Sequence, residues 1–409
     1  MSEAATIRRI SPVTIIVAGC LISMIGFAVR SVMGFFQLPV ITEYGWGRDV
    51  FGLALAVQNL FWGIGQPFAG AVADRFGTVR VLIVGMLAYA AGLVLMTVSS
   101  TPSAFVLTAG VLFGLALAGC SFNLVLAAFG KLLPAEWRGT AFGVGTAAGS
   151  FGQFLFSPLA VGLIDSVGWR GALLVFAGLM LVSIPLALAL RTDGLATGAQ
   201  AGGEPHPGLA STLAHAFGHP SYILLVLGFF TCGFHLAFIT VHLPAHLKDG
   251  GLNPAIGGWV VACIGLFNVV GSLMSGWLCS RVPRRYLLAV IYAARSVAIA
   301  FFFFLPLTPV TAILFGASMG LLWLSTVPPT SSLVATMFGT RDMAMLYGFV
   351  FFSHQVGGFL GVWLAGLLYE STGTYDLIWY ASMALGIASA AVNLPIVEAA
   401  APSRRPAAA

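Results

Sequence analysis

The stretch of sequence that decides the fold is Gly70-Ala-Val-Ala-Asp-Arg-Phe-Gly-Thr-Val-Arg80. It lies between two apolar runs, residues 51–72 and 79–99, and each is close to the ~20 apolar residues that cross a bilayer as a helix. A spanning helix cannot end in hydrocarbon with a bare turn, because its backbone groups would have no water partner there. The charged stretch is therefore predicted to be a short loop in water or among the lipid headgroups.

The chemistry of five residues suggests what this loop does. Gly70 and Gly77 allow close approach and a sharp reversal of the chain. Asp74 can cap the next helix or pair with an arginine. Arg75 and Arg80 can anchor the loop on the cytoplasmic side of the membrane. We predict that these five residues form a conformational loop motif.

The spacing Gly-x-x-x-Asp-Arg-x-Gly-x-x-Arg resembles the loop between helices 2 and 3 of the major facilitator superfamily. A partial copy, Gly276-Trp-Leu-Cys-Ser-Arg281 followed by Arg284 and Arg285, begins 206 residues later, where the second half of that superfamily repeats the loop. Ser280 stands in this copy where the first loop has Asp74, so the copy lacks the carboxylate. The resemblance implies a transporter fold of two related halves.

The composition independently indicates an integral membrane protein. Of the 409 residues, 59% are hydrophobic and 8% are charged, whereas a soluble domain has about 25% charged residues. The net charge of +5 is scattered over short loops, which argues against nucleic acid as a partner. The five cysteines fall in or beside apolar runs, which argues against a disulfide framework. The first run, from about Pro12, is expected to be a spanning helix and not a removed signal peptide.

Twelve apolar runs predict an all-α fold with twelve transmembrane helices in two pseudo-symmetric six-helix halves. The runs are residues 13–41, 51–72, 79–99, 103–131, 139–163, 170–190, 221–247, 255–278, 286–306, 309–333, 344–368 and 375–397. The predicted divisions are an N-terminal half (1–190), a linker rich in Gly, Pro and Ala (191–219), a C-terminal half (220–398) and a disordered tail (399–409).

The basic residues of the loops predict the orientation. With the N-terminus inside, thirteen arginines and lysines fall on the inner side and three on the outer side. The outer three are Arg48, Arg170 and Lys248. An even number of helices then places both termini, and the linker, in the cytoplasm. We therefore expect a multi-pass protein of the inner (cytoplasmic) membrane.

Two arginines, Arg30 and Arg295, remain inside the predicted membrane helices, and all thirteen acidic residues fall in loops, tails or helix ends. A buried arginine needs a partner, and the membrane interior offers it no carboxylate here. A guanidinium binds a carboxylate through two parallel hydrogen bonds. We therefore predict Arg30 as the main anchor of an anionic substrate. The alternative is that both arginines bond to backbone carbonyls or to Gln and Asn side chains.

A second resemblance sharpens the substrate class. Arg30-Ser-Val-Met-Gly-Phe-Phe36 resembles helix 1 of monocarboxylate transporters, in which a basic residue precedes a Phe-Phe pair. Gly45-Trp-Gly-Arg48 and Gly168-Trp-Arg170 also resemble that group and its oxalate/formate antiporter relatives. Animal monocarboxylate transporters carry an acidic and a basic residue one turn apart on helix 8, but Asn268 and Ser272 stand at the matching positions here. The family's pair for proton and substrate is therefore missing.

Histidines are the remaining candidates for carrying a proton. His235 and His354 are predicted to contact the substrate and to serve in proton coupling, because imidazole binds carboxylates and titrates near physiological pH. The alternative is a neutral histidine bonded to a neighbouring helix. His242 and His246 follow His235 on roughly one helix face. Such a row without nearby acids or thiolates does not predict a metal site.

Two amides complete the predicted site, and a proline pair marks a predicted bend. Asn123 and Asn268 are expected to line a polar cavity, although most amides in membrane bundles make interhelical hydrogen bonds worth about 1 kcal/mol or less. Pro328-Pro329 must interrupt backbone bonding in the tenth run, which frees carbonyls and suggests either a gating bend or a structural kink.

These features predict a secondary active transporter that moves a small organic anion by proton symport or anion exchange, with two halves rocking about a central site. The alternatives are efflux of hydrophobic drugs or other amphiphiles, and a sensor or receptor on the same scaffold. No nucleotide-binding loop of the form Gly-x-x-x-x-Gly-Lys-Ser/Thr is present, so the sequence predicts neither an enzyme nor a cofactor. The expected partners are the small anion, protons and lipid, with the protein acting as a monomer.

Overall fold

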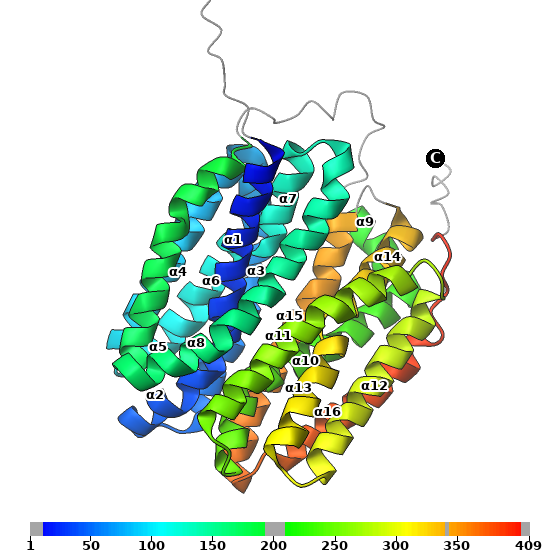
Figure 1. The fold of residues 1–409 in the computed structure, drawn as a ribbon. Coiled ribbons are helices and arrows are strands. Elements are labelled where there is room, and N and C mark those ends of the chain that lie inside the picture. Colours follow the sequence, from blue (N-terminus) through cyan, green and yellow to red (C-terminus); the bar gives the residue numbers. More distant parts are fainter. Residues whose placement is uncertain (1–10, 193–208, 340–342, 402–409) are drawn as a thin grey trace, which may run out of the picture.

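A computed structural model describes residues 11–192, 209–339 and 343–401. The described chain is folded into helices that run side by side in a single bundle (Figure 1). The elements before the linker are α1 (Pro12–Ser31), η1 (Met33–Phe36), α2 (Gln37–Tyr44), α3 (Arg48–Phe76), α4 (Thr78–Val98), α5 (Pro102–Phe105), η2 (Val106–Leu112), α6 (Phe113–Cys120), α7 (Phe122–Leu132), α8 (Ala135–Ser183) and η3 (Ile184–Leu190). The later elements are α9 (Leu209–Phe217), α10 (Pro220–Asp249), α11 (Pro254–Leu278), α12 (Arg284–Phe304), α13 (Pro309–Leu322), α14 (Val327–Phe338), α15 (Met343–Thr372) and α16 (Asp376–Asn393).

These helices make the twelve predicted membrane crossings. Within the described ranges, nine helical stretches are long and apolar enough to cross a bilayer. One of them, Gly143–Leu190, holds two crossings because the chain turns at Gly168, where φ is 73°. The helices α3 and α16, of 29 and 18 residues, supply the other two crossings. The apolar runs of the sequence therefore match the spanning segments to within a few residues.

In the part of the chain that the structure describes, residues outside the helices interrupt three crossings within their length. The first breaks at Val32, between α1 and the short helix η1. The fourth breaks at Ser121, whose ψ of 155° is extended. The tenth breaks at residues 323–326, directly before Pro328-Pro329. A proline has no N–H and its ring clashes with the carbonyl one turn earlier, so this last break lies where the sequence predicted it.

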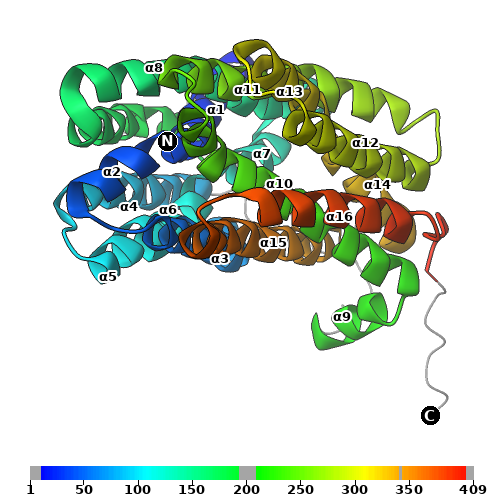
Figure 2. The same cartoon turned by 90° about the horizontal axis from the view of Figure 1, so that it is seen from below.

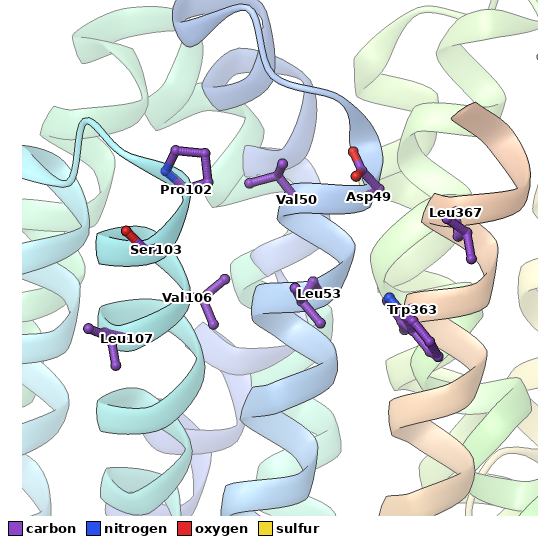
Figure 3. A pocket seen from close by; sticks show the side chains of 9 residues that line it. All are labelled: Asp49, Val50, Leu53, Pro102, Ser103, Val106, Leu107, Trp363 and Leu367. Atoms are coloured by element: carbon purple, nitrogen blue, oxygen red, sulfur yellow. The ribbon is translucent and has the colours of Figure 1, made fainter. Parts of the chain in front are cut away.

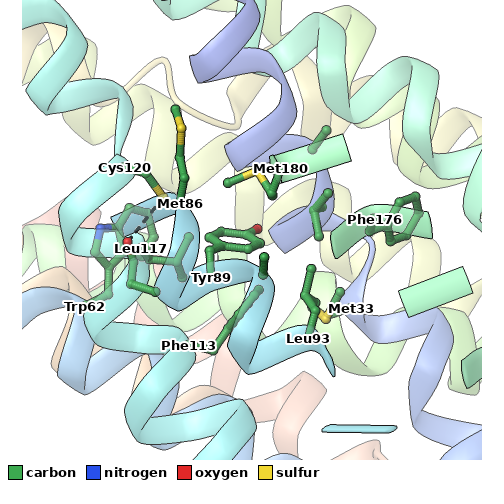
Figure 4. Close-up of a cluster of buried hydrophobic side chains, with 14 of the residues drawn as sticks. Met33, Trp62, Met86, Tyr89, Leu93, Phe113, Leu117, Cys120, Phe176 and Met180 are labelled. Atoms are coloured by element: carbon green, nitrogen blue, oxygen red, sulfur yellow. Dashed lines mark hydrogen bonds between the residues drawn. The ribbon is translucent and has the colours of Figure 1, made fainter. Parts of the chain in front are cut away.

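Each half has its own hydrophobic core. In the first half, the buried Tyr89 ring packs against Phe113 with 4.3 Å between centroids, and its hydroxyl donates to the Gly26 carbonyl of α1 at 2.9 Å (Figure 4). In the second half, the fully buried Trp379 of α16 packs against Phe238 of α10 at 4.7 Å. Burial within each half therefore holds its helices together.

Two pairs of helices bring the two halves into contact. We call the end at which α1 begins and α14 finishes the linker end, and the opposite end the far end. Close contacts join α3 to α15 and α8 to α11 (Figure 2). A Cβ added at Gly265 would lie 2.7 Å from the Ser150 carbonyl oxygen, and one added at Gly366 would lie 2.8 Å from that of Arg48.

The predicted linker and tail fall only partly within the described ranges. The linker contains helix α9, and Phe217 at its end packs on Tyr222 of α10 with 5.4 Å between ring centroids. The predicted tail is described as far as Ala401, whose N–H donates to the Met337 carbonyl at 2.8 Å. The rest of both segments lies outside the described residues.

Candidate substrate site

Arg30 lies in the last turn of α1, directly before the break at Val32. Its Nη2 donates to Asn59 Oδ1 of α3 at 2.6 Å, and its guanidinium lies over the Trp62 ring, 5.1 Å from the centroid. Its Nε is buried and has no hydrogen-bond acceptor. No ion pair to Arg30 is found in the described part of the chain. Arg30 is thus a partly satisfied cation in the interior of the bundle.

Helix α15 of the second half packs against α3 close to Arg30 and Trp62. The Trp62 ring packs edge-on against Phe351 at 5.7 Å, and Phe351 stacks on His354 at 5.5 Å. Gln355 Oε1 lies 3.3 Å from His354 Nδ1. A Cβ added at Gly63 of α3 would lie 2.9 Å from the Gln355 side chain, so the two helices are in close contact here.

Two donors without acceptors stand out in this region. Arg30 Nε and Gln355 Nε2 are both buried and both lack a partner, one from each half of the protein. A buried donor that makes no hydrogen bond is costly, so such groups normally have a partner. A ligand rich in acceptor oxygens would supply one. The arrangement favours an anion over a cation or a neutral donor.

A small cavity continues along the same face of α1. Phe27, one turn before Arg30, lines it together with Phe122, Gly149 and Ser150 of the first half and Leu324 of the second. Its volume is about 20 Å³, room for roughly one water molecule. The predicted Asn123 is half-buried beside Phe122, at the start of α7.

Asn268 is fully buried and links the two halves beside this cavity. Its Nδ2 donates to Ser150 Oγ of α8 at 2.8 Å. Its Oδ1 accepts the backbone N–H of Leu324 at 3.0 Å and the hydroxyl of Ser272 at 3.1 Å. In this conformation Asn268 therefore satisfies the broken backbone between α13 and α14, and its contacts are of the interhelical kind.

Arg295 takes the alternative role that the sequence left open. It is fully buried, and its Nε and Nη2 donate to the Leu322 carbonyl at 3.1 and 2.6 Å. Nη2 also contacts the Trp323 carbonyl and lies 3.6 Å from Cys232 Sγ. These carbonyls are the ones freed by the break before Pro328-Pro329. Arg295 thus caps the C-terminus of α13, where a positive charge is favourable.

Two histidines of the predicted row on α10, His235 and His242, contact different helices. His235 is fully buried, and its Nε2 lies 2.8 Å from the Ser382 carbonyl of α16. No hydrogen bond joins it to Arg30 among the described residues. His242 Nδ1 lies 3.1 Å from Gln37 Nε2, which brings α10 of the second half against α2 of the first.

A cluster at the far end holds the two halves together, and we call Arg48, Asp249, Tyr375 and His242 the far-end cluster. Arg48 donates to both carboxylate oxygens of Asp249 at 2.7 Å and to the Tyr375 hydroxyl at 2.9 Å. Burial raises the pKa of Tyr375, so this hydroxyl keeps its proton and can donate to His242 Nδ1 at 3.0 Å. The backbone N–H of Arg48 donates to Glu370 at 2.6 Å.

The second tryptophan-arginine segment stays within the first half. Trp169 Nε1 donates to Glu43 at 2.6 Å, and Arg170 pairs with the same carboxylate. Arg170 also donates to the Tyr44 hydroxyl at 2.8 Å and to the Thr97 carbonyl at 3.0 Å. Two segments resemble those of monocarboxylate transporters. The segment Gly45–Arg48 contacts the second half of the protein, whereas Gly168–Arg170 contacts its own half.

The loop motif lies at the linker end, as a turn between α3 and α4. Gly77 has a φ of 90° and ends α3, and Gly70 faces open space. Arg80 is exposed in the first turn of α4, and the side chains of Asp74 and Arg75 lie outside the described atoms. In the second copy of the loop, Glu398 supplies a carboxylate that lies 3.3 Å from Arg284.

The sequence did not single out Trp62 and Gln355 as site residues. Trp62 lies three positions after Asn59, so both project from one face of α3. Gln355 adjoins His354, which was predicted. Helical spacing around the buried arginine would have indicated Trp62, but the pairing of α3 with α15 was needed to bring Gln355 to the same place.

The fold agrees with comparisons to known proteins. The family model of the Major Facilitator Superfamily matches residues 17–362, so the chain belongs to this superfamily of membrane proteins.

Among its relatives is the "Uncharacterized MFS-type transporter YcxA" of Bacillus subtilis (strain 168), which is 25% identical over 85% of this chain and 86% of the relative. Monocarboxylate transporter 13 of Rattus norvegicus is 27% identical, over 85% of this chain and 79% of the relative. The crystal structure of a D-xylose-proton symporter superposes with a TM-score of 0.75 over 94% of this chain and 98% of that one. At 14% identity, that structure supports the fold alone.

Proposed function

We propose that this protein is a secondary active transporter that moves a small organic anion, of the monocarboxylate kind, across the membrane by alternating access. One observation carries the proposal: Arg30 is a cation in the bundle interior with an unpartnered Nε and no carboxylate partner among the described residues. A substrate carboxylate would accept hydrogen bonds from Arg30 and from Gln355 across the interface of the two halves. The proposal involves no chemical step.

The remaining basic residue of the interior supports a substrate with a single negative charge. Arg295 donates through Nε and Nη2 to the carbonyls of Leu322 and Trp323 and so holds the broken tenth crossing, while its Nη1 is buried without a partner. Arg30 is proposed as the substrate's cation because it follows Phe27, a residue of the small cavity, by one turn of α1. The relatives named as monocarboxylate transporters favour the same class of substrate.

For coupling to protons we propose His354 over His235. His354 is half-buried and contacts Gln355, one of the two unpartnered donors. His235 is fully buried against α16. A histidine next to the bound anion can gain or lose a proton as the anion binds, because the opposite charges favour each other.

We further propose that the linker end faces the cytoplasm, which makes this conformation inward-facing. The basic residues support this orientation, since the described linker-end loops carry Arg80, Arg281, Arg284 and Arg285. The far end is closed by the far-end cluster, in which Arg48 of the first half donates to Asp249 and Tyr375 of the second. Rocking of the two halves would expose the Arg30 region to each side in turn.

The proposal is tested by uptake into proteoliposomes. Labelled mono- and dicarboxylates are offered with and without an inward proton gradient, to wild type, Arg30→Ala, His354→Gln and Arg170→Gln. Arg170 is a matched control, because it is an arginine outside the site whose partners Glu43 and Tyr44 lie in its own half. We expect saturable monocarboxylate uptake that Arg30→Ala abolishes and Arg170→Gln preserves, with all variants eluting as folded monomers.

The outcomes separate the alternatives. Loss of the proton dependence in His354→Gln would support symport, and uptake that needs only an internal anion would support exchange. Anion uptake that survives in Arg30→Ala would remove Arg30 from the site. Movement of hydrophobic cations or neutral amphiphiles, with no carboxylate moving, would overturn the anion proposal in favour of efflux of amphiphiles.

A further inference from the structure

Asn59 of α3 is the side chain that orients Arg30, and its own amide group is fixed. Asn59 is 2% exposed, and its Nδ2 donates to the Leu55 carbonyl one turn earlier at 2.9 Å. Because the Nδ2 end is engaged in this way, the Oδ1 end is directed at Arg30, whose Nη2 donates to it at 2.6 Å. The amide therefore sets the direction in which the guanidinium points.

Asn59 lies at the contact between the two halves of the protein. A Cβ added at Gly358 of α15 would lie 3.5 Å from Asn59 Cγ. Figure 3 shows α3 and α15 side by side nearer the far end, where Leu53 and Trp363 line an apolar groove. Asn59 follows Leu53 along α3, toward the level of Gln355. A change at Asn59 therefore acts where the proposed site lies.

The amide of Asn59 carries no charge, and this is unusual for the partner of a buried guanidinium. Charged side chains in protein interiors are normally paired with an opposite charge. Aspartate has the size and shape of asparagine, so a carboxylate oxygen would fit where Oδ1 of Asn59 now accepts from Arg30. The neutral amide accepts one hydrogen bond and leaves the positive charge of Arg30 uncompensated by any ion pair in the described ranges.

We propose that Asn59 is the positioning residue that makes the site selective for an anion: it orients Arg30 and, being neutral, leaves the positive charge free for the substrate carboxylate. A carboxylate at this position would pair with Arg30 in place of the substrate and would also repel it. This inference rests on the role proposed above for Arg30 and adds the residue that sets the charge of the site.

Two substitutions of Asn59 distinguish this role from a merely structural one. Asn59→Ala lets Arg30 move but leaves its charge available to an anion. Asn59→Asp keeps the shape and the acceptor but neutralises Arg30. A structural residue would tolerate the aspartate of equal size better than alanine, both in binding and in stability. A positioning residue that sets the charge gives the reverse order in binding alone.

The test measures equilibrium binding and thermal unfolding of the full-length protein. The probes are radiolabelled acetate, lactate and benzoate, and the one that wild type binds most tightly is used throughout. Wild type is compared with Asn59→Asp, Asn59→Ala, Arg30→Ala and the control Asn253→Asp. Asn253 is exposed and caps α11 by accepting the Ala255 N–H at 2.9 Å. Aspartate is an equally good cap, so this control adds the same charge away from the site.

We expect Asn59→Asp to weaken binding by about 30-fold, the size of one lost hydrogen bond to a charged group. Asn59→Ala should weaken binding less. In thermal unfolding the order should reverse, with Asn59→Asp melting above Asn59→Ala because the new carboxylate pairs with Arg30. Asn253→Asp should match wild type in both measurements. Binding by Asn59→Asp as tight as that by Asn59→Ala, or a melting temperature no higher, would overturn the proposal.

The same measurements separate this inference from the proposed function. Binding that is lost in Arg30→Ala but kept in Asn59→Asp would rule out the role of Asn59 and leave Arg30 as the anchor. Binding that survives in Arg30→Ala, or wild type that binds none of the three acids, would overturn the proposed monocarboxylate site and the role of Asn59 with it.

Discussion

Replacing Arg48 with glutamine tests whether the far-end cluster determines which end of the bundle is closed. Arg48 belongs to the first half, and the polar partners of its side chain, Asp249 and Tyr375, belong to the second. These contacts exist only while the halves are together at the far end. The substitution is therefore expected to favour opening at that end.

The size of the shift follows from burial and charge. Arg48 is 6% exposed, but the Asp249 side chain is 34% exposed, so solvent screens the pair from one side. A hydrogen bond to a charged group contributes about 1.5–3 kcal/mol, and glutamine can keep one weaker bond. We expect a net loss of roughly 2 kcal/mol, which changes the ratio of far-end-open to far-end-closed molecules by about 30-fold.

The assay is a distance measurement between spin labels at the far end, one in each half. Ser166 and Lys248 are exposed attachment points, on a background in which the five cysteines are replaced. Arg170→Gln is the matched control, because the side chain of Arg170 contacts Glu43, Tyr44 and the Thr97 carbonyl, all in its own half. Arg48→Gln should move population to longer distances, and Arg170→Gln should not.

Two results would refute this reasoning. An unchanged distance distribution in Arg48→Gln would mean that apolar packing between α3 and α15 closes the far end without help from the ion pair. An equal shift in Arg170→Gln would mean that loss of an outer arginine loosens the first half generally, and that the contact across the halves is not the cause.

The remaining predictions concern the linker end and the broken tenth crossing. Asp74→Asn should slow conformational exchange more than it weakens substrate binding, because the loop lies away from the site. Stopped-flow measurements give the rate of exchange, and titrations give the binding affinity. A loss of affinity with an unchanged exchange rate would contradict this prediction. Arg295→Ala should lower the melting temperature, because it leaves the Leu322 and Trp323 carbonyls buried without a donor, at about 1–3 kcal/mol each. Arg281→Ala, an exposed arginine, should melt as wild type does.

The broken crossings connect the site to the movement of the two halves. The break between α13 and α14 brings Leu324 to the small cavity, and Asn268 holds the Leu324 N–H while it donates to Ser150 of the other half. Arg295 holds the carbonyls on the opposite side of the break. The backbone groups on both sides of the break are thus held by the side chains of Asn268 and Arg295.

The sequence alone determined the membrane-spanning segments and the family. Crossing a bilayer depends on a sum of local transfer free energies, so the apolar runs and the loop from Gly70 to Arg80 could be identified without knowing any partner. The break before Pro328-Pro329 is likewise local, since proline removes a backbone donor wherever it stands.

Only the tertiary structure decided what each buried polar residue does. Arg30 and Arg295 are the same residue type in similar apolar surroundings, and each keeps one unpartnered nitrogen, yet Arg30 donates to Asn59 beside Trp62 and Arg295 caps freed carbonyls. His235 and His354 separate in the same way, one against α16 and one beside Gln355. The reason is physical: the partner of a buried donor comes from a helix distant in the sequence, and helix packing chooses it.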